Sequence, residues 1–446
     1  MEKYMSLMFR RLLLSAGAVA LIGVGVMAWQ PGGGVKQANA ATTDYEQLQK
    51  FSRVMEMVRQ AYVEKVGDEK LIDGALSGML SSLDPHSTYM DKEMFKQMNV
   101  DTTGEFGGLG IEISAAEGGI RIVSPIEDTP AYRAGIKAGD LIIKIDDELA
   151  RDMSLADAVK KMRGKPNTSI TLTIFRKGED APREVKIVRA IIKVKSVKSD
   201  LLAPGYAYLR ITQFQERTDD LLEKQIGELK KRAGGQLSGA VLDLRSNPGG
   251  LLNQAVAVSD TFLNKGNIVS TKSRAGKNMS FDAQAGDALG GLPLIVLINH
   301  GSASASEIVA GALQDHHRAV LLGTRSFGKG SVQSVVPLSD GTAIKFTTAL
   351  YYTPSGRSIQ ATGIEPDIKV EQEAIKPAEK GKARLPSLFE SNLKGHLANG
   401  NHDKKVVKKK TIAGDDASAA MKERLQIDTQ LQRALDLLRG LHALKG

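Results

Sequence analysis

The chain has no cysteine among its 446 residues. Disulfide bonds, thiolate nucleophiles and cysteine-linked lipids are therefore excluded, and packing alone must hold the fold together. Metal-binding patterns are missing as well, because there is no His-Glu-x-x-His motif and the seven histidines are scattered. We expect neither a metal nor any other cofactor.

Aromatic residues are also scarce, at 5% of the chain, and they do not alternate with basic ones. The net charge is +9, and residues 1–40 contribute +3 of it through four basic residues against Glu2. Much of the remainder falls in the lysine-rich run 404–410, which we interpret as a solvated linker. Since no nucleic-acid motif accompanies this modest charge, nucleic acid is not an expected partner.

Only one stretch, residues 12–29, is apolar over the length that a membrane span needs. Lys3, Arg10 and Arg11 precede it, and Ala38-Asn39-Ala40 offers a small-x-small cleavage site. We interpret residues 1–40 as a signal peptide, with an uncleaved membrane anchor as the alternative. The chain is then exported. In a Gram-negative bacterium it would lie in the periplasm, or at the inner membrane if the segment stays uncleaved.

Three serines follow an apolar, strand-like run at 294–298 and lead into a helix-like segment at 308–313. A hydroxyl at such a turn lies at a helix N-terminus, where backbone N–H groups stabilise developing negative charge. These residues alone do not choose among Ser302, Ser304 and Ser306 as a nucleophile. Helix capping is the simpler alternative for all three.

A nucleophilic serine needs a base, and the histidines are poorly placed for that role. His316 and His317 lie about 18 Å from Ser304 along the predicted helix, at 1.5 Å per residue. His300 is close in sequence, but no neighbouring residue is placed to hold it as a triad histidine. Lysine is therefore the more plausible base.

Lys329 lies between Gly328 and Gly330, just before an alternating run at 332–338. The two glycines allow it to approach another segment closely. A lysine base must be neutral, so its pKa has to fall by about three units from about 10.4, which burial can cause. Gln333, on the same face of a strand, would accept a hydrogen bond from the amine and orient it.

These residues resemble the carboxyl-terminal processing peptidases, serine endopeptidases of the tail-specific protease type. In the family pattern the nucleophile precedes Ala-Ser-Glu, the base follows 25 residues later, and a glutamine follows four residues after that. The spacing here gives Ser304, Lys329 and Gln333. The resemblance includes three further motifs: Ser82-Leu83-Asp84-Pro85-His86-Ser87, the stretch from Leu242 to Gly250, and Gly363-Ile364-Glu365-Pro366-Asp367.

The resemblance implies an endopeptidase that recognises the C-terminal region of a protein and cleaves through an acyl-enzyme on Ser304. Lys329 is then the general base, and Gln333 orients it. The N–H groups of Gly250 and Ala305 are implied to form the oxyanion hole. The resemblance also implies a catalytic core, residues 191–372, with the crotonase and Clp-peptidase fold.

Residues 103–190 show short alternating strands with one helix, predicted at Leu155–Met162. Within them Gly108-Leu109-Gly110-Ile111 resembles the loop of a PDZ domain, whose N–H groups bind a terminal carboxylate while the peptide adds as a strand. We therefore expect protein or peptide substrates with free C-termini. Arg163, at the end of the helix, is a candidate for coupling this domain to the core, and a solvated cation is the alternative.

Helical patterns flank these two domains. Residues 41–102 place Leu48, Phe51 and Val54 at helical spacing, and residues 373–446 form a linker followed by an amphipathic helix with Leu431, Leu435 and Leu438 on one side. That last helix packs either on its own chain or on a second subunit. The expected fold is thus multidomain α+β, with a PDZ domain, a crotonase-like or Clp-peptidase-like α/β core and helical ends.

Assembly into a homo-oligomer and a helper or adaptor protein are further expectations about partners. Two other functions fit parts of the pattern. A non-catalytic PDZ scaffold would deliver protein tails to another enzyme, but the serine and lysine motifs argue against it. A crotonase-type acyl-CoA enzyme would not need the export segment or the PDZ domain.

Overall fold

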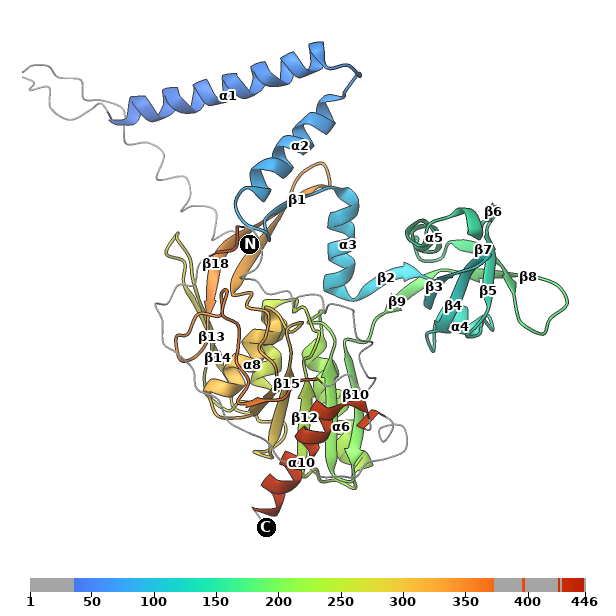
Figure 1. Ribbon diagram of the computed structural model, residues 1–446, viewed down its shortest axis with the longest axis vertical. Coiled ribbons are helices and arrows are strands. Elements are labelled where there is room, and N and C mark those ends of the chain that lie inside the picture. The colour runs from blue at the N-terminus through green and yellow to red at the C-terminus, as the bar shows by residue number, and fades with distance from the viewer. Residues whose placement is uncertain (1–35, 373–394, 398–423, 426, 445–446) are drawn as a thin grey trace, which may run out of the picture. The chain divides into compact units, whose positions relative to one another are not determined.

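The computed structural model describes residues 36–372, 395–397, 424–425 and 427–444 (Figure 1). Most of the predicted signal peptide, the linker prolines at 377 and 386, and the lysine run 404–410 lie outside these residues. The chain divides into two units, residues 1–72 and 73–446, and each is described by itself.

The first unit is dominated by α1, Lys36–Ala61, which passes through the predicted cleavage point after Ala40. The apolar side chains that the helical spacing predicted are present, but Leu48, Phe51 and Val54 are 65%, 45% and 53% exposed. This side of α1 therefore remains accessible to solvent. None of the helices among the described residues is long and apolar enough to cross a membrane.

The chain between α1 and the PDZ domain contains α2 (Asp68–Ser81), β1 (Thr88–Met90) and α3 (Lys92–Thr103). Asp91 begins α3 by accepting a hydrogen bond from the Met94 N–H, and Gly104 ends the helix in the left-handed conformation. The sequence predicted only helix here. Strand β1 forms because its three residues pair with β18 (Ala343–Tyr352), a contact that no local pattern reveals.

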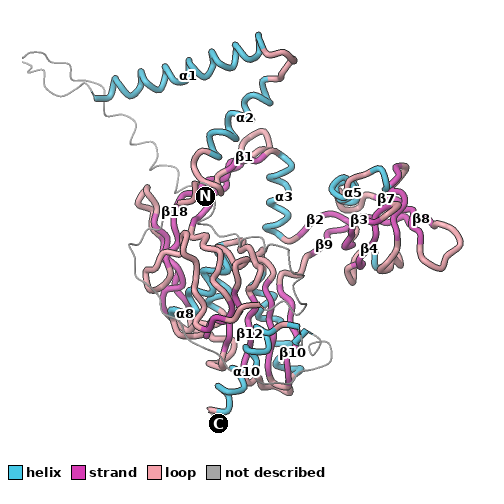
Figure 2. The backbone as a smooth tube through the Cα atoms, in the orientation of Figure 1, coloured by secondary structure: helices cyan, strands magenta, loops and turns pink. Residues whose placement is uncertain are grey.

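The predicted PDZ region forms a sheet in the order β3-β4-β5-β7-β8, entered and left through the paired strands β2 and β9 (Figure 2). Its helix α5 spans Leu155–Met162, as predicted, and buries Ala158 and Met162 against the sheet. The elements are β2 (Glu105–Gly108), β3 (Ile111–Ala116), β4 (Gly119–Pro125), α4 (Pro130–Arg133), β5 (Leu141–Ile145), β6 (Glu148–Leu149), a 3-10 turn (Ala150–Asp152), α5, β7 (Ser169–Phe175), β8 (Arg183–Val188) and β9 (Ala190–Lys193).

The catalytic region is built on a sheet in the order β10-β11-β12-β15-β16-β19, parallel from β11 onward. Its strands are β10 (Val197–Ala203), β11 (Tyr206–Ile211), β12 (Gly239–Asp243), β15 (Leu294–Ile298), β16 (Val320–Gly323) and β19 (Ile368–Lys369). One face packs on α6 (Thr218–Arg232), α7 (Leu252–Asp260) and α8 (Ala305–Asp315). This is the alternating strand and helix order that the sequence predicted.

A second sheet has the order β1-β18-β13-β14. Strand β17 also pairs with β18, outside this order. The further strands of this sheet are β13 (Gly266–Lys272), β14 (Met279–Ala283) and β17 (Ser331–Pro337). The β17–β18 hairpin turns at Asp340-Gly341, where Gly341 has a φ of 89°. Lys329 lies two residues before this hairpin.

The C-terminal helix α10, Thr429–Ala443, covers the opposite face of the parallel sheet. Leu431, Leu435 and Leu438, the predicted apolar side of the helix, are all at most 2% exposed. They pack against side chains of β12, β15 and β16. Of the two packing modes left open by the sequence, this structure contains docking on the helix's own chain.

Candidate active site

Ser304 is the last residue before α8, at the turn that leaves β15. Its φ of 55° and ψ of −112° are strained values for a residue with a side chain. Sharp strand-to-helix turns of this kind place a nucleophile in front of a helix N-terminus. The turn thus has the geometry expected for an activated serine.

Hydrogen bonding distinguishes the three serines that the sequence left equivalent. The Ser302 hydroxyl donates to the Leu244 carbonyl at 2.8 Å, and the Ser306 hydroxyl donates to the Asn247 carbonyl at 2.9 Å. Both of these serines are 0% exposed, whereas Ser304 retains 8% exposure. Ser302 and Ser306 therefore join neighbouring loops, and Ser304 is the serine left accessible.

A fully buried carboxylate, Glu307, connects the serine turn to the lysine loop. Its Oε2 accepts the Ser304 N–H at 2.8 Å and the Lys329 N–H at 2.9 Å. Its Oε1 accepts the Gly328 N–H at 2.7 Å and the Ser326 hydroxyl at 2.5 Å. The backbones of the predicted nucleophile and base therefore meet at one oxygen atom. Sequence reasoning gave Glu307 no role, although Ser-x-x-Glu before an apolar run is a recognised helix-start signal.

Burial raises the pKa of Glu307 to about 7, although its four hydrogen-bond donors favour the ionised form. The carboxyl is therefore balanced between its two protonation states near neutral pH. Its charged form is the one that can accept all four donors, because a protonated oxygen would itself need an acceptor.

Gln333 lies in β17, where its amide nitrogen donates to the Ser331 hydroxyl at 2.9 Å and to the Thr347 hydroxyl at 3.3 Å. These bonds leave its carbonyl oxygen as the acceptor that the predicted role requires. However, Lys329 precedes the strand, so strand alternation does not orient its side chain as the sequence argument assumed. A Lys329 to Gln333 hydrogen bond stays a prediction.

The loop after β12 brings Gly249 and Gly250 against the serine turn. A Cβ atom on Gly249 would lie 2.9 Å from the Ser304 Cβ and 3.0 Å from the Ala305 nitrogen. Gly250 has a φ of 143° and crosses Phe214 so closely that a Cβ would lie 2.1 Å from its carbonyl oxygen. Within the described chain, neither the Gly250 nor the Ala305 N–H donates a hydrogen bond. Both remain candidates for the oxyanion hole.

Two asparagines to which the sequence pattern assigned no separate role hold these loops together. Asn247 accepts the Gly249 N–H at its side chain (2.9 Å) and the Ala303 N–H at its carbonyl (3.0 Å). Asn299 accepts the N–H groups of Ser246 and Gly301 through one side-chain oxygen. The glycine turn and the serine turn are thereby fixed to each other.

The other family motifs support the same region. Gly330 donates its N–H to the Gln360 side chain, and a Cβ there would lie 2.4 Å from the Gln360 nitrogen. In the 363–367 motif, the Ile364 N–H donates to Ser326, the same hydroxyl that binds Glu307. The close approach predicted for the glycines beside Lys329 is therefore present.

The Ser82–Ser87 motif touches the strand opposite Gln333. The Ser87 hydroxyl donates to Asp84 at 2.7 Å and accepts the Thr347 N–H at 3.2 Å. Burial opposes ionisation of Asp84, but the bonds from Ser87 and the His86 N–H hold its pKa below the ordinary value. The motif therefore fixes β18 where Thr347 meets the Gln333 amide.

The histidines are placed elsewhere. His300 is exposed to solvent, and the His316 Nε2 lies 2.6 Å from the Asn267 carbonyl oxygen. No group of three or more His, Asp or Glu side chains that could hold a metal occurs in the described part of the chain.

In the PDZ region, Gly108 to Ile111 join β2 to β3. Leu109 and Gly110 offer their carbonyl oxygens to the N–H groups of Ala131 and Ile126, respectively. Their own N–H groups donate no hydrogen bond among the described residues, so both stay candidates for binding a peptide carboxylate. Gly110 has a φ of 79° and passes close to Thr129, which only a glycine permits.

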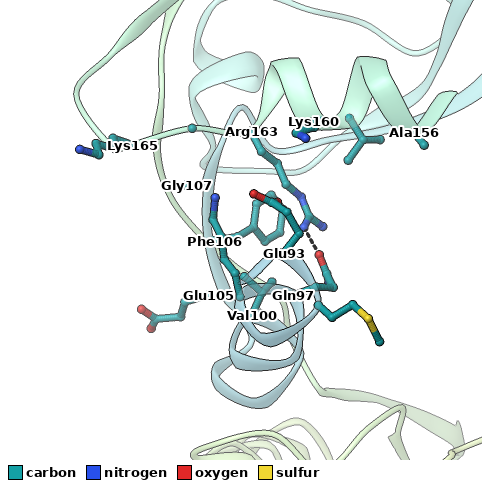
Figure 3. A pocket seen from close by; sticks show the side chains of 14 residues that line it. Glu93, Gln97, Val100, Glu105, Phe106, Gly107, Ala156, Lys160, Arg163 and Lys165 are labelled. Carbon is teal, nitrogen blue, oxygen red and sulfur yellow. Dashed lines mark hydrogen bonds between the residues drawn. The ribbon is translucent and has the colours of Figure 1, made fainter. Parts of the chain in front are cut away.

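A pocket of about 850 Å³ lies between α3, β2 and α5 (Figure 3). Arg163 extends across it, donates a hydrogen bond to Gln97 of α3 and places its guanidinium 4.7 Å from the centre of the Phe106 ring. It is therefore more than a solvated helix-end cation, because it joins the PDZ helix to α3. Its role in coupling to the catalytic core stays a prediction.

Comparisons with known proteins match three parts of this chain. Residues 205–370 match peptidase family S41, residues 121–176 match a PDZ domain, and residues 28–94 match the N-terminal domain of the activating protease CtpB. These matches cover the catalytic sheet from β11 onward, most of the PDZ sheet, and the N-terminal helices α1 and α2.

Two relatives align with most of this chain. A carboxy-terminal-processing protease of Bartonella bacilliformis is 51% identical over 404 residues, which cover 90% of each chain. The carboxy-terminal processing protease CtpA of Bacillus subtilis is 37% identical over 75% of this chain and 71% of its own. Among solved structures, a photosystem II D1 C-terminal processing protease is 29% identical, with a TM-score of 0.43, over 72% of this chain and 92% of that one.

Proposed function

Because this chain belongs to the carboxy-terminal-processing proteases of peptidase family S41, we propose that Ser304 and Lys329 form its catalytic dyad. The protein is a serine protease with a PDZ domain, and the alternative of a non-catalytic scaffold is thereby set aside. One observation supports the dyad most strongly. Glu307 binds the backbone N–H groups of both residues with a single oxygen atom.

In the proposed reaction, neutral Lys329 takes the proton of the Ser304 hydroxyl as the serine oxygen attacks the scissile carbonyl carbon. The negative oxygen of the tetrahedral intermediate is stabilised by the N–H groups of Gly250 and Ala305. The lysine ammonium then gives its proton to the leaving amine. Water hydrolyses the acyl-enzyme by the same steps, with Lys329 again as the base and Gln333 as its orienting partner.

Substrate choice is proposed to depend on the C-terminal carboxylate of the protein to be cleaved. The free N–H groups of Leu109 and Gly110 support this proposal, since a carboxylate can accept both. Peptide binding at this loop would select the tail, and the dyad would then cut the chain. A helper protein that presents tails to the PDZ domain is compatible with this scheme.

Location and assembly are proposed on separate grounds. The basic residues, apolar run and cleavage site of residues 1–40 support export to the periplasm or retention at the inner membrane. The apolar, exposed side of α1 supports assembly with a further copy of the chain.

The dyad is tested by a set of four variants assayed on one unfolded protein substrate. Ser304→Ala and Lys329→Ala should each lower kcat by about three or more orders of magnitude, and the double variant should be little worse, because the two residues act as a unit. Ser302→Ala is the matched control. It should lose about 1–3 kcal/mol of stability, since the Leu244 carbonyl loses its donor, but keep most activity per folded molecule. An inactive Ser302→Ala beside an active Ser304→Ala would contradict the assignment.

A further inference from the structure

A buried ion-pair cluster connects the start of α10 to the residue that precedes the glycine turn. The Arg245 guanidinium, in a residue that is 5% exposed, donates to both oxygens of Asp428 at 2.8 and 2.7 Å. It also donates to both oxygens of Asp243 at 2.9 and 2.7 Å. The contact with Asp428 joins residues 183 positions apart in the sequence.

Asp428 has a second function at the same place. Its Oδ1 accepts the Leu431 N–H at 3.0 Å and so caps the first turn of α10. Gln430 adds to the connection, because its side chain accepts from Arg245 at 3.0 Å and donates to the Val370 carbonyl at 2.7 Å. The beginning of the helix is therefore fixed to Arg245 by two adjacent polar side chains.

Arg245 is held in one orientation, so that a change at Asp428 would displace it. Its Nε, Nη1 and Nη2 atoms all donate to the cluster, and its backbone N–H donates to Asp243 at 3.0 Å. Burial opposes ionisation of Asp243, but Arg245 holds the pKa of that carboxyl below its ordinary value, so the pair remains charged. Bidentate arginine and carboxylate pairs fix orientation as well as distance.

The residues directly after Arg245 form the turn that faces the nucleophile. Ser246 has a φ of 54°, and its N–H donates to Asn299 at 2.8 Å. Three residues later, Gly249 approaches the Cβ of Ser304. A shift of Arg245 would therefore move the start of a short, strained turn that ends at Gly250.

We propose that Asp428 is a positioning residue for catalysis, which acts through Arg245 to hold the Gly250 N–H where the reaction's oxyanion forms. This inference rests on the proposed role of Gly250 in the oxyanion hole. It links only the start of the C-terminal helix to the glycine turn, because the cluster reaches the turn from the face of the sheet opposite α8.

The test compares two variants of the full chain. Asp428→Asn keeps the shape of the side chain but places an NH2 group against the arginine. We expect kcat to fall by about 10- to 100-fold, the range for a misplaced catalytic donor, with KM changed by less than about twofold. Affinity for a peptide boronate, whose tetrahedral adduct imitates the intermediate, should fall by a similar factor. Asp428→Glu, which restores the charge, should recover part of both.

Leu435→Ala is the matched control. It removes a buried side chain of the same helix, which is 2% exposed, and should lower Tm without changing kcat per folded molecule. Unchanged kcat in Asp428→Asn, an unchanged boronate affinity, or an equal loss of kcat in Leu435→Ala would each overturn the inference. These outcomes leave the dyad untouched, whereas an active Ser304→Ala would overturn the proposed function itself.

Discussion

Glu307 accepts hydrogen bonds from the backbones of both residues of the proposed dyad. Its two oxygens receive four donors from two loops, and no water is needed to satisfy it. An amide in its place would bring an NH2 group against N–H donors, which leaves buried polar groups unpaired. The geometry of Ser304 and Lys329 should therefore be unusually sensitive to this carboxyl.

The first prediction concerns Glu307→Gln. Because burial raises the pKa of Glu307 from 4.5 to about 7, the stability that the carboxyl contributes is present below pH 4.5 and is lost as pH rises through 7. The amide of Glu307→Gln does not titrate. The free energy of unfolding of the wild type minus that of Glu307→Gln should therefore fall by about 3 kcal/mol as the pH rises from 4.5 to 7. Urea denaturation at several pH values measures this difference.

Glu307→Gln should also lower kcat at least about tenfold at pH 8, because the two backbones lose their common acceptor. Glu371→Gln, at an exposed position, controls for the loss of one negative charge. A stability difference that stays constant between pH 4.5 and 7 would refute the proposed titration.

At this scale the sequence indicated candidate catalytic residues but not the side chains that hold them in place. The spacing of Ser304, Lys329 and Gln333 was visible because a family pattern records it. The partners of Glu307 come from the serine turn and the lysine loop, and those of Asn247 and Asn299 come from the glycine turn and the serine turn. No local pattern shows which carbonyl or N–H a buried side chain will meet, so these roles required the structure.

At the scale of elements, the site depends on how closely two loops approach each other. Gly249 and Gly250 lie in the turn from β12 to α7, and both have a positive φ, of 102° and 143°. Neither leaves room for a Cβ atom. The turn therefore needs glycine both for its backbone conformation and for its contact with the serine turn.

The second prediction separates those two needs. Gly249→Ala and Gly235→Ala both place alanine at a φ near 101°, but a Cβ on Gly249 would lie 2.7 Å from the Ala303 oxygen, whereas one on Gly235 meets nothing within 4 Å. Both variants should lose about 1–2 kcal/mol of stability from backbone strain. Only Gly249→Ala should lower kcat by about 100-fold, because the oxyanion turn moves. Equal activity of the two folded variants would show that the contact is unimportant.

Elements whose apolar residues recur at a clear helical or strand spacing could be predicted from the sequence. The helix α5 and the strand β15 have the bounds that the residue pattern indicated. Strand β1 was missed, and the β13–β14 pair was not identified, because their pairing with β18 and with each other is decided by tertiary contacts. The apolar side of α10 was visible in the sequence, but the face that it covers was not.

At the scale of the whole molecule, selection and cleavage are assigned to different domains of one chain. The PDZ loop has the two N–H groups proposed to bind a carboxylate, whereas the proposed dyad belongs to other sheets, since Ser304 follows β15 and Lys329 precedes β17. Such a division predicts that a change at the substrate's end affects cleavage some distance away from it.

The third prediction therefore uses one peptide with a free and with an amidated C-terminus. The free form should have a kcat/KM at least about tenfold higher, since hydrogen bonds to a charged group contribute more than 1.4 kcal/mol. Gly110→Ala, whose Cβ would lie 2.3 Å from the Cβ of Thr129, should remove this preference. Gly118→Ala has the same φ of 79° and nothing within 4 Å, so it should keep it. Equal cleavage of both peptides by the wild type would contradict carboxylate recognition.

The most direct measurement of the central claim is to identify the residue that becomes covalently modified. The full chain is treated with a peptidyl phosphonate, which reacts with an activated serine, and the adduct is located by mass spectrometry of the digested protein. We predict one adduct per chain, on Ser304, absent from Ser304→Ala and formed far more slowly in Lys329→Ala. An adduct on Ser302, on Ser306 or on a residue outside this turn, in an enzyme that is active before labelling, would contradict the account.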